Sequence, residues 1–312
     1  MDLFLATLNQ MAFLFTFIII GYILAKLKFI PDGAPGILSK LENYVFIPAL
    51  VLGTFISNFT TEKLSTSWKL IVGCLVLEIV VIAVSMAVVR LVAKGKYIQN
   101  IYLYGLCFSN FSFMGNAVVS TLFPEIFLEY IIFTLVLWVL IYVWGAPSLL
   151  IGDAEAKGIK DRLKSFLNPM FVCMIIGMLI GIFKIPMPAF VDSAITSTAN
   201  CMSPVAMLLT GMTIAKIDIK KVLKIKSIYV VSFLRLIVYP LIFIGFIMLV
   251  PLSKTFVICA VASLAMPLGL NTIVIPAGYG KDTTMASGMA LISHVLAVVT
   301  IPAIFLIFDM VI

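Results

Sequence analysis

The chain has 312 residues, of which 63% are hydrophobic and only 11% are charged. A soluble domain carries about 25% charged residues, so this composition predicts an all-α integral membrane protein surrounded by a lipid bilayer. The formal net charge of +7 does not indicate a nucleic-acid partner, because the basic residues fall in short connections between apolar segments, where orientation in the bilayer accounts for them.

Ten apolar segments are long enough to cross a bilayer, since a spanning helix needs about 20 residues. The connections between them are short and polar, so we expect one membrane domain. The first segment follows an acid rather than a base and lacks a convincing cleavage site, which indicates a true helix and not a signal peptide. The predicted spans are residues 6–28, 38–58, 68–92, 98–123, 128–151, 166–184, 191–215, 227–250, 255–279 and 284–309.

Basic residues are distributed unevenly between the two ends of these spans. With the N-terminus placed outside the cell, sixteen lysine and arginine residues fall in the inner connections and four in the outer ones. This bias follows the positive-inside rule. We therefore expect a multi-pass protein of the plasma or inner membrane with both termini extracytoplasmic. The two largest inner clusters are Lys157, Lys160, Arg162 and Lys164, and Lys216, Lys220, Lys221, Lys224 and Lys226.

The two halves of the chain resemble one another at an offset of 156 residues. The matching landmarks are Gly21 with Gly177, Lys28 with Lys184, and Pro48 with Pro204. Residues 1–152 and 153–312 would then each hold five spans. Five is odd, so the second half enters the membrane from the opposite side, which predicts an inverted-topology repeat of the kind that builds carriers.

Two of the spans are interrupted near the middle, at residues 107–116 (CFSNFSFMGN) and 262–276 (ASLAMPLGLNTIVIP). Each freed backbone group in hydrocarbon costs several kcal/mol, so such breaks are tolerated only where they line a cavity. In secondary transporters they build the substrate site. The repeat offset carries Asn116 onto Thr272, so we expect the two breaks to meet near the middle of the membrane.

The polar side chains at the breaks have two readings. They can satisfy freed backbone groups, or they can bind an organic anion with the help of the positive N-terminal ends of half-helices. We expect glycine and proline to shape the breaks. The candidate substrate-binding residues are Asn110, Ser112, Asn116, Asn271, Thr272 and Arg235, and the candidate helix-breaking residues are Gly115, Pro267, Gly269 and Pro276.

Two charged side chains lie deep inside predicted spans, Glu78 in 68–92 and Arg235 in 227–250. A charge at this depth costs at least about 2.5–3.5 kcal/mol and indicates function by default. One interpretation is a structural ion pair between the two spans. The other is that Glu78 carries a coupling proton or cation, while the Arg235 fork binds a substrate carboxylate through two oxygens.

His294 is the only histidine of the chain, and it lies in the last predicted span. A single histidine makes no metal site, so we expect either an interhelical hydrogen bond or a proton relay. We expect no metal and no cofactor, apart from H+ or Na+ as a coupling ion. The Asn168–Pro169 pair is a typical cap and start of a helix.

Several motifs, in this order along the spans, resemble the auxin efflux carrier family of bacterial permeases, relatives of the plant PIN-formed auxin exporters. They are IIGYILAK, VFIPALVLGTFI, NFSFMGNAVVSTLF, the NP of 168–169, SPVAMLLTGMTIA, RLIVYP and PLGLNTIVIPAGYGKDTTMAS.

The resemblance implies an elevator-type secondary carrier of small organic carboxylates, malate, malonate or auxin-like, that forms a homodimer. Its fold has ten helices in two inverted sets of five, with the fourth and ninth helices broken and crossing. The first, second, sixth and seventh helices would form the scaffold, and the third to fifth and eighth to tenth the transport side. The family often has a proline after the glycine that here precedes Asn116, and a threonine at His294.

Other classes fit the sequence less well. A cation/proton antiporter would need acidic residues at the crossing, and an intramembrane enzyme would need a nucleophile with a base or a metal cluster. A non-transporting sensor would usually add a soluble domain, and a channel would show no saturation. We therefore predict a transporter and no enzymatic activity.

Overall fold

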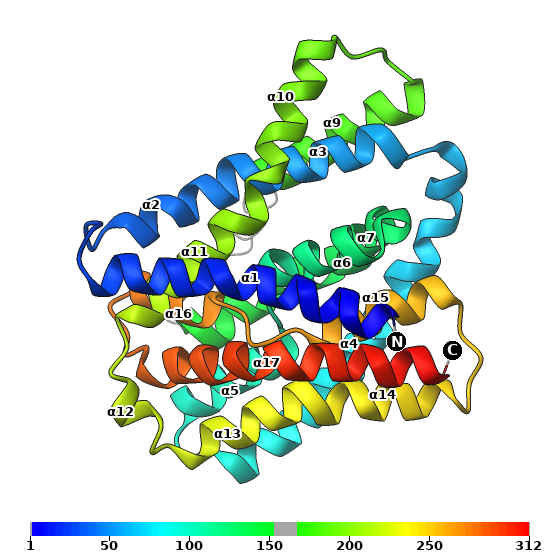
Figure 1. Ribbon diagram of the computed structural model, residues 1–312. Helices are drawn as coiled ribbons and strands as arrows, with labels where there is room; N and C mark the ends of the chain where they lie inside the picture. The colour runs from blue at the N-terminus through cyan, green and yellow to red at the C-terminus, as the bar shows by residue number, and fades with distance from the viewer. Residues whose placement is uncertain (1, 153–166, 312) are drawn as a thin grey trace.

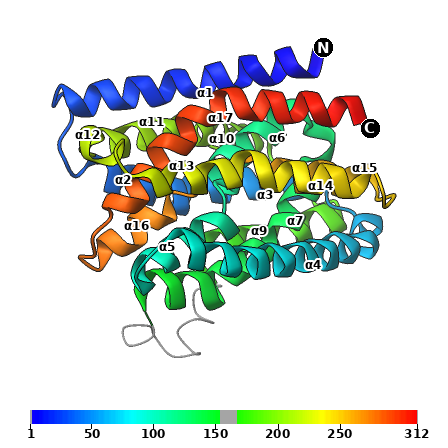
Figure 2. The same ribbon diagram turned by 90° about the horizontal axis from the view of Figure 1, so that it is seen from below.

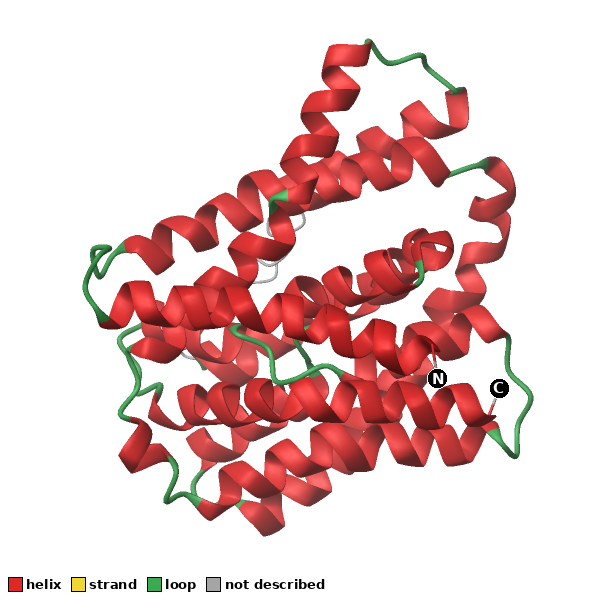
Figure 3. Ribbon diagram, in the orientation of Figure 1, coloured by secondary structure: helices red, strands yellow, loops and turns green. Residues whose placement is uncertain are grey.

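A computed structural model describes residues 2–152 and 167–311 as helices joined by short connections (Figures 1 and 3), with no β-strand among them. The basic cluster between residues 157 and 164 lies outside the described residues. In the first half, the helices are α1 (Asp2–Lys26), α2 (Ala34–Leu41), α3 (Ile47–Asn58), α4 (Thr61–Val92), α5 (Lys96–Cys107), α6 (Asn116–Leu122) and α7 (Phe127–Leu140).

The second half continues with α9 (Pro169–Phe183), α10 (Ala189–Asn200), α11 (Met202–Ala215), the short α12 (Ile219–Val222), α13 (Lys226–Phe233), α14 (Tyr239–Ile247), α15 (Lys254–Ala265), α16 (Asn271–Gly278) and α17 (Thr284–Val311). As predicted, Asn168 caps α9: its side-chain oxygen accepts a hydrogen bond from Phe171 N at 3.2 Å, and Pro169 begins the helix.

Several helices contain or continue into π-helical turns, in which the backbone hydrogen bonds join residues five apart instead of four. These turns are Glu42–Phe46 between α2 and α3, Phe111–Gly115 before α6, Ile141–Ile151 after α7 and Leu234–Val238 between α13 and α14. A π-turn rotates the following side chains and often accompanies a functional site. Two of the four contain or border candidate residues, Arg235 and Asn110.

Helical segments occupy all ten predicted spans, but they differ in length and continuity. Six uninterrupted stretches of the described chain are long and apolar enough to cross a membrane. The remaining four predicted spans are broken, jointed or short. The span predicted at 191–215 is jointed at Cys201, and α4 begins seven residues earlier than predicted because Thr60 caps it through Lys63 N.

The helices lie roughly side by side, and both termini lie at the same end of the bundle (Figures 1 and 2), opposite the lysine-rich connection that contains α12. Helices α1 and α11 pack so closely that a Cβ atom on Gly211 would lie 1.9 Å from the carbonyl oxygen of Ile18. Small residues of this kind let helix backbones approach each other in membranes.

Candidate functional site

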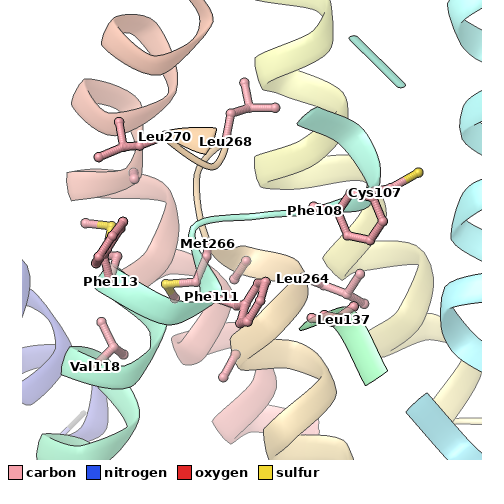
Figure 4. Packing of buried hydrophobic residues seen from close by; sticks show 14 of the residues in the cluster. Cys107, Phe108, Phe111, Phe113, Val118, Leu137, Leu264, Met266, Leu268 and Leu270 are labelled. Carbon is pink, nitrogen blue, oxygen red and sulfur yellow. The ribbon is translucent and has the colours of Figure 1, made fainter. Parts of the chain in front are cut away.

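The two predicted breaks cross in direct contact. The chain is not helical between α5 and the Phe111–Gly115 turn, nor between α15 and α16. Ser109 and Leu268 form an antiparallel bridge, and Asn110 N donates to Pro267 O at 2.7 Å. Figure 4 shows the two extended stretches passing each other beside Phe108 and Leu268. Four half-helices therefore end at one point deep in the bundle.

Gly269 makes this close approach possible. A Cβ atom at this position would lie 3.0 Å from Ser109 O and 3.1 Å from Phe108 O, which is too tight for an ordinary side chain. Pro267 also lies in the break. The structure places Pro276 elsewhere, inside α16, and corrects our expectation that it breaks the helix. Only one intrahelical bond is lost there, close to the end of α16.

Arg235 holds the crossing from one side. Its guanidinium is 1% exposed and donates to three backbone carbonyls, through Nη1 to Leu106 O at 2.7 Å, Nη2 to Ser263 O at 2.8 Å and Nε to Met266 O at 3.4 Å. These carbonyls belong to the C-terminal ends of α5 and α15. A cation is favoured there, because helix C-termini carry partial negative charge and unpaired acceptors.

Glu78 does not form the structural ion pair that we considered. Among the described residues, no nitrogen of Arg235 lies within 4 Å of its carboxylate. Glu78 is 4% exposed, and its Oε1 has no hydrogen-bond partner in the described chain. Arg235 binds backbone instead, because three converging carbonyls satisfy its planar fork without a second charge.

His294 joins the last helix to the break. Its Nδ1 lies 2.8 Å from Ala290 O, and its Nε2 lies 3.0 Å from Asn110 Nδ2. A carbonyl only accepts, so Nδ1 carries the hydrogen, and Nε2 of the neutral ring then accepts from the Asn110 amide. This is the interhelical hydrogen bond that the sequence allowed. Protonation at Nε2 would turn this acceptor into a donor facing the amide NH2.

The Phe111–Gly115 turn is fixed by a tyrosine that sequence reasoning missed. Tyr130 of α7 donates from its hydroxyl to Phe111 O at 3.0 Å. A Cβ atom on Gly115 would lie 2.2 Å from that hydroxyl, so Gly115 makes room for this bond. A second missed tyrosine, Tyr104, accepts a hydrogen bond from Asn271 Nδ2 at 3.3 Å. A buried tyrosine needs a polar partner, and this was the available signal.

Hydroxyl groups near the break between α15 and α16 form hydrogen bonds with backbone groups. Thr272 Oγ1 donates to Gly269 O at 2.7 Å, and Ser293 Oγ accepts from Leu268 N at 3.2 Å. On the other side, Ser109 Oγ donates to Ser263 O at 2.9 Å. These groups satisfy the backbone that the breaks set free.

Four candidate residues border two small cavities at the crossing. The Ser112 hydroxyl is buried and has no hydrogen-bond partner in the described chain. It borders a cavity of about 20 Å³ shared with Asn110 and Asn271, and a second of about 10 Å³ shared with Asn116. A water molecule needs about 10–15 Å³, so in this conformation the crossing holds water-sized space only. A larger groove of about 470 Å³, between α4 and α14, has an almost wholly apolar lining without these residues.

An all-helical bundle with long apolar helices and a polar crossing of two broken ones defines a multi-pass membrane transporter. The family model described as membrane transport protein matches residues 6–158 and 156–305. The chain therefore belongs to that family, the auxin efflux carrier family that its motifs resemble. No match was found among curated proteins.

Proposed function

We propose that the protein is a secondary transporter of small organic carboxylates, with its substrate site at the crossing. The observation that carries this proposal is the distribution of partial charges there. Arg235 neutralises the C-terminal ends of α5 and α15, whereas the N-terminal ends of the Phe111–Leu122 helix and of α16 lie at the polar cavity without a compensating anion among the described residues that line it. Helix N-termini favour anions.

The residues then divide into two groups. Asn110, Ser112, Asn116 and Asn271 would contact the substrate, because they line the two small cavities at the crossing. Arg235 and Thr272, which we expected to bind substrate, would instead support the backbone of the crossing, because their donors already bind carbonyls.

We propose further that residues 1–152 and 153–312 form two inverted five-helix repeats. In this arrangement α1, α2, α3, α9, α10 and α11 form the scaffold of a homodimer, and α4–α7 with α13–α17 move as an elevator. Both termini would be extracytoplasmic in the plasma or inner membrane. The hydrogen bonds of Arg235 support this division. They join the Leu234–Val238 turn to α5 and α15, which are all assigned to the moving part.

Coupling would use H+ or Na+, with Glu78 and His294 as the candidate groups. Glu78→Gln keeps the shape of the side chain but removes its titration. We expect it to abolish the pH dependence of uptake while substrate binding stays measurable. Unchanged pH dependence in this variant would exclude Glu78 from coupling.

Counterflow in proteoliposomes tests the transport function directly. Vesicles loaded with unlabelled malate, malonate or indole-3-acetate should accumulate the labelled compound transiently when it is added outside. Empty vesicles and protein vesicles loaded with a neutral sugar are the controls. Absence of exchange for every carboxylate tried would refute the anion proposal.

A further inference from the structure

Trp138 of α7 borders three cavities that lead from the surface to the crossing. The outermost is a vestibule of about 260 Å³ lined by Asn43, Tyr44, Tyr142 and Asn168. Tyr44 is 65% exposed, so the vestibule opens to the surroundings of the protein. The two inner cavities of about 10 and 20 Å³ are those that contain Ser112, and Trp138 lines both.

The indole is held between two aromatic rings. On the vestibule side it stacks on Tyr142, with ring centroids 5.7 Å apart and planes at 20°. On the crossing side it meets the edge of Phe111, at 5.3 Å and 77°. Both geometries are favourable for aromatic pairs. Phe111 begins the π-turn that follows the first break, so the indole is packed directly against the crossing.

The inner cavities are too small for a carboxylate, and the vestibule is large enough. A dicarboxylate has several heavy atoms, whereas each inner cavity holds about one water. Ser112, the hydroxyl without a partner in the described chain, lies on the inner side of Trp138. Among the lining residues, Trp138 is the one that borders the vestibule and both inner cavities, so its indole lies on the way from the vestibule to Ser112.

We propose that Trp138 is a gate of the substrate path, closed in this structure, that swings away from Phe111 to admit the carboxylate to Ser112. The inference rests on the proposed function for the identity of the solute. The gate itself controls whether a solute reaches Ser112, and this access can be measured without transport.

Cysteine accessibility measures the gate. Ser112→Cys is introduced into a background in which Cys173 and Cys201, the two incompletely buried cysteines, are replaced by serine. The rate of labelling by the anionic reagent sulfonatoethyl methanethiosulfonate is compared with Trp138 present and with Trp138→Ala. A closed gate opens only in a minor population of roughly 0.1–10%, so its removal should accelerate labelling by at least about tenfold.

Three further variants make the result decisive. Tyr44→Cys, in the open vestibule, should react at the same rate with and without Trp138. The background protein without Ser112→Cys gives the residual labelling of the buried cysteines. Trp138→Phe keeps an aromatic ring of smaller reach and should accelerate labelling to an intermediate degree; it decides the matter if Trp138→Ala does not fold.

Equal labelling rates at Ser112→Cys in the Trp138, Trp138→Phe and Trp138→Ala proteins would overturn the gate. Because labelling needs no transport, this outcome is distinct from a failure of counterflow. Accelerated labelling without any carboxylate exchange would retain the gate and refute the proposed substrate class.

Discussion

Asn110 of the first break and Met266 of the second lie 156 residues apart in the chain, yet the two breaks are built differently. The break between α15 and α16 is made by Pro267 and Gly269, and Thr272 satisfies its backbone at once. The break after α5 contains no proline. It continues into a π-turn, and its Asn110 and Ser112 side chains do not bind the local backbone.

This difference indicates that the two breaks have different roles, one as a support and one as the main contact for the ligand. The break with proline and glycine also has its backbone satisfied, by Thr272 next to it and by Arg235 and Ser293 from other helices, so it can serve as a rigid support. A break made of polar residues depends on Tyr130, His294 and Arg235 from other helices, and it leaves polar groups free for a ligand. We therefore expect substrate choice to depend mainly on the first break and stability on both.

The largest effect is expected where both breaks depend on one side chain. Arg235→Ala would leave three buried carbonyls without their charged donor, and an unsatisfied buried group costs about 1–3 kcal/mol. We predict a loss of about 3–5 kcal/mol of stability, seen as a large drop in the melting temperature of the detergent-solubilised protein. Arg235→Lys keeps the charge but not the planar fork of donors, so its melting temperature should lie between those of the wild type and of Arg235→Ala. A melting temperature equal to that of the wild type would contradict the role of Arg235.

A separation of affinity from stability is expected at Ser112. Its hydroxyl has no partner in the described chain, so Ser112→Ala should leave the melting temperature unchanged or slightly higher. A hydrogen bond to a charged ligand is worth about 1.5–3 kcal/mol, so affinity for the carboxylate should fall by about tenfold or more. Substrate-induced shifts in melting temperature measure both quantities. Loss of stability without loss of affinity would assign Ser112 to the backbone.

Gly115→Ala tests how the first break is held in shape. The new methyl group would lie 2.2 Å from the Tyr130 hydroxyl, so the ring must withdraw from Phe111 O. Overpacking of this kind costs about 1–3 kcal/mol. Tyr130→Phe in the same protein removes the clash and should restore part of the loss. Gly245→Ala is the matched control, because nothing lies within 4 Å of its added methyl group. Equal effects at both glycines would refute the steric account.

The smallest effect is expected at the second break. Thr272→Val keeps the shape of the side chain and removes the hydrogen bond to Gly269 O. We predict a loss of about 0.5–1.5 kcal/mol of stability and an affinity within about twofold of the wild type. Thr272→Val should therefore lower stability and leave affinity nearly unchanged, whereas Ser112→Ala should lower affinity and leave stability unchanged. A fall in affinity as large as that of Ser112→Ala would show that Thr272 itself contacts the substrate.

Much of this arrangement could be predicted from the sequence. The breaks could be predicted because asparagine, glycine and proline are conspicuous in an apolar span. These same residues interrupt the helix, so no knowledge of distant partners is needed. The role of Arg235 was not visible, because its partners are backbone carbonyls that every residue possesses. The π-turns depend on packing between helices rather than on local residue preference. Trp138 looked like one more apolar residue, and only the arrangement of three cavities around it distinguishes it.

The bonds of Arg235 also bear on how the protein is made. The guanidinium that binds Leu106 O lies 129 residues further along the chain. The carbonyls at the end of α5 therefore stay without this donor until about half of the second half, residues 153–235, has been synthesised. Until then they require another partner, because an unpaired carbonyl in lipid costs several kcal/mol. The first half should consequently remain incomplete at its centre after it enters the membrane, and closure of the crossing should be a late step of assembly.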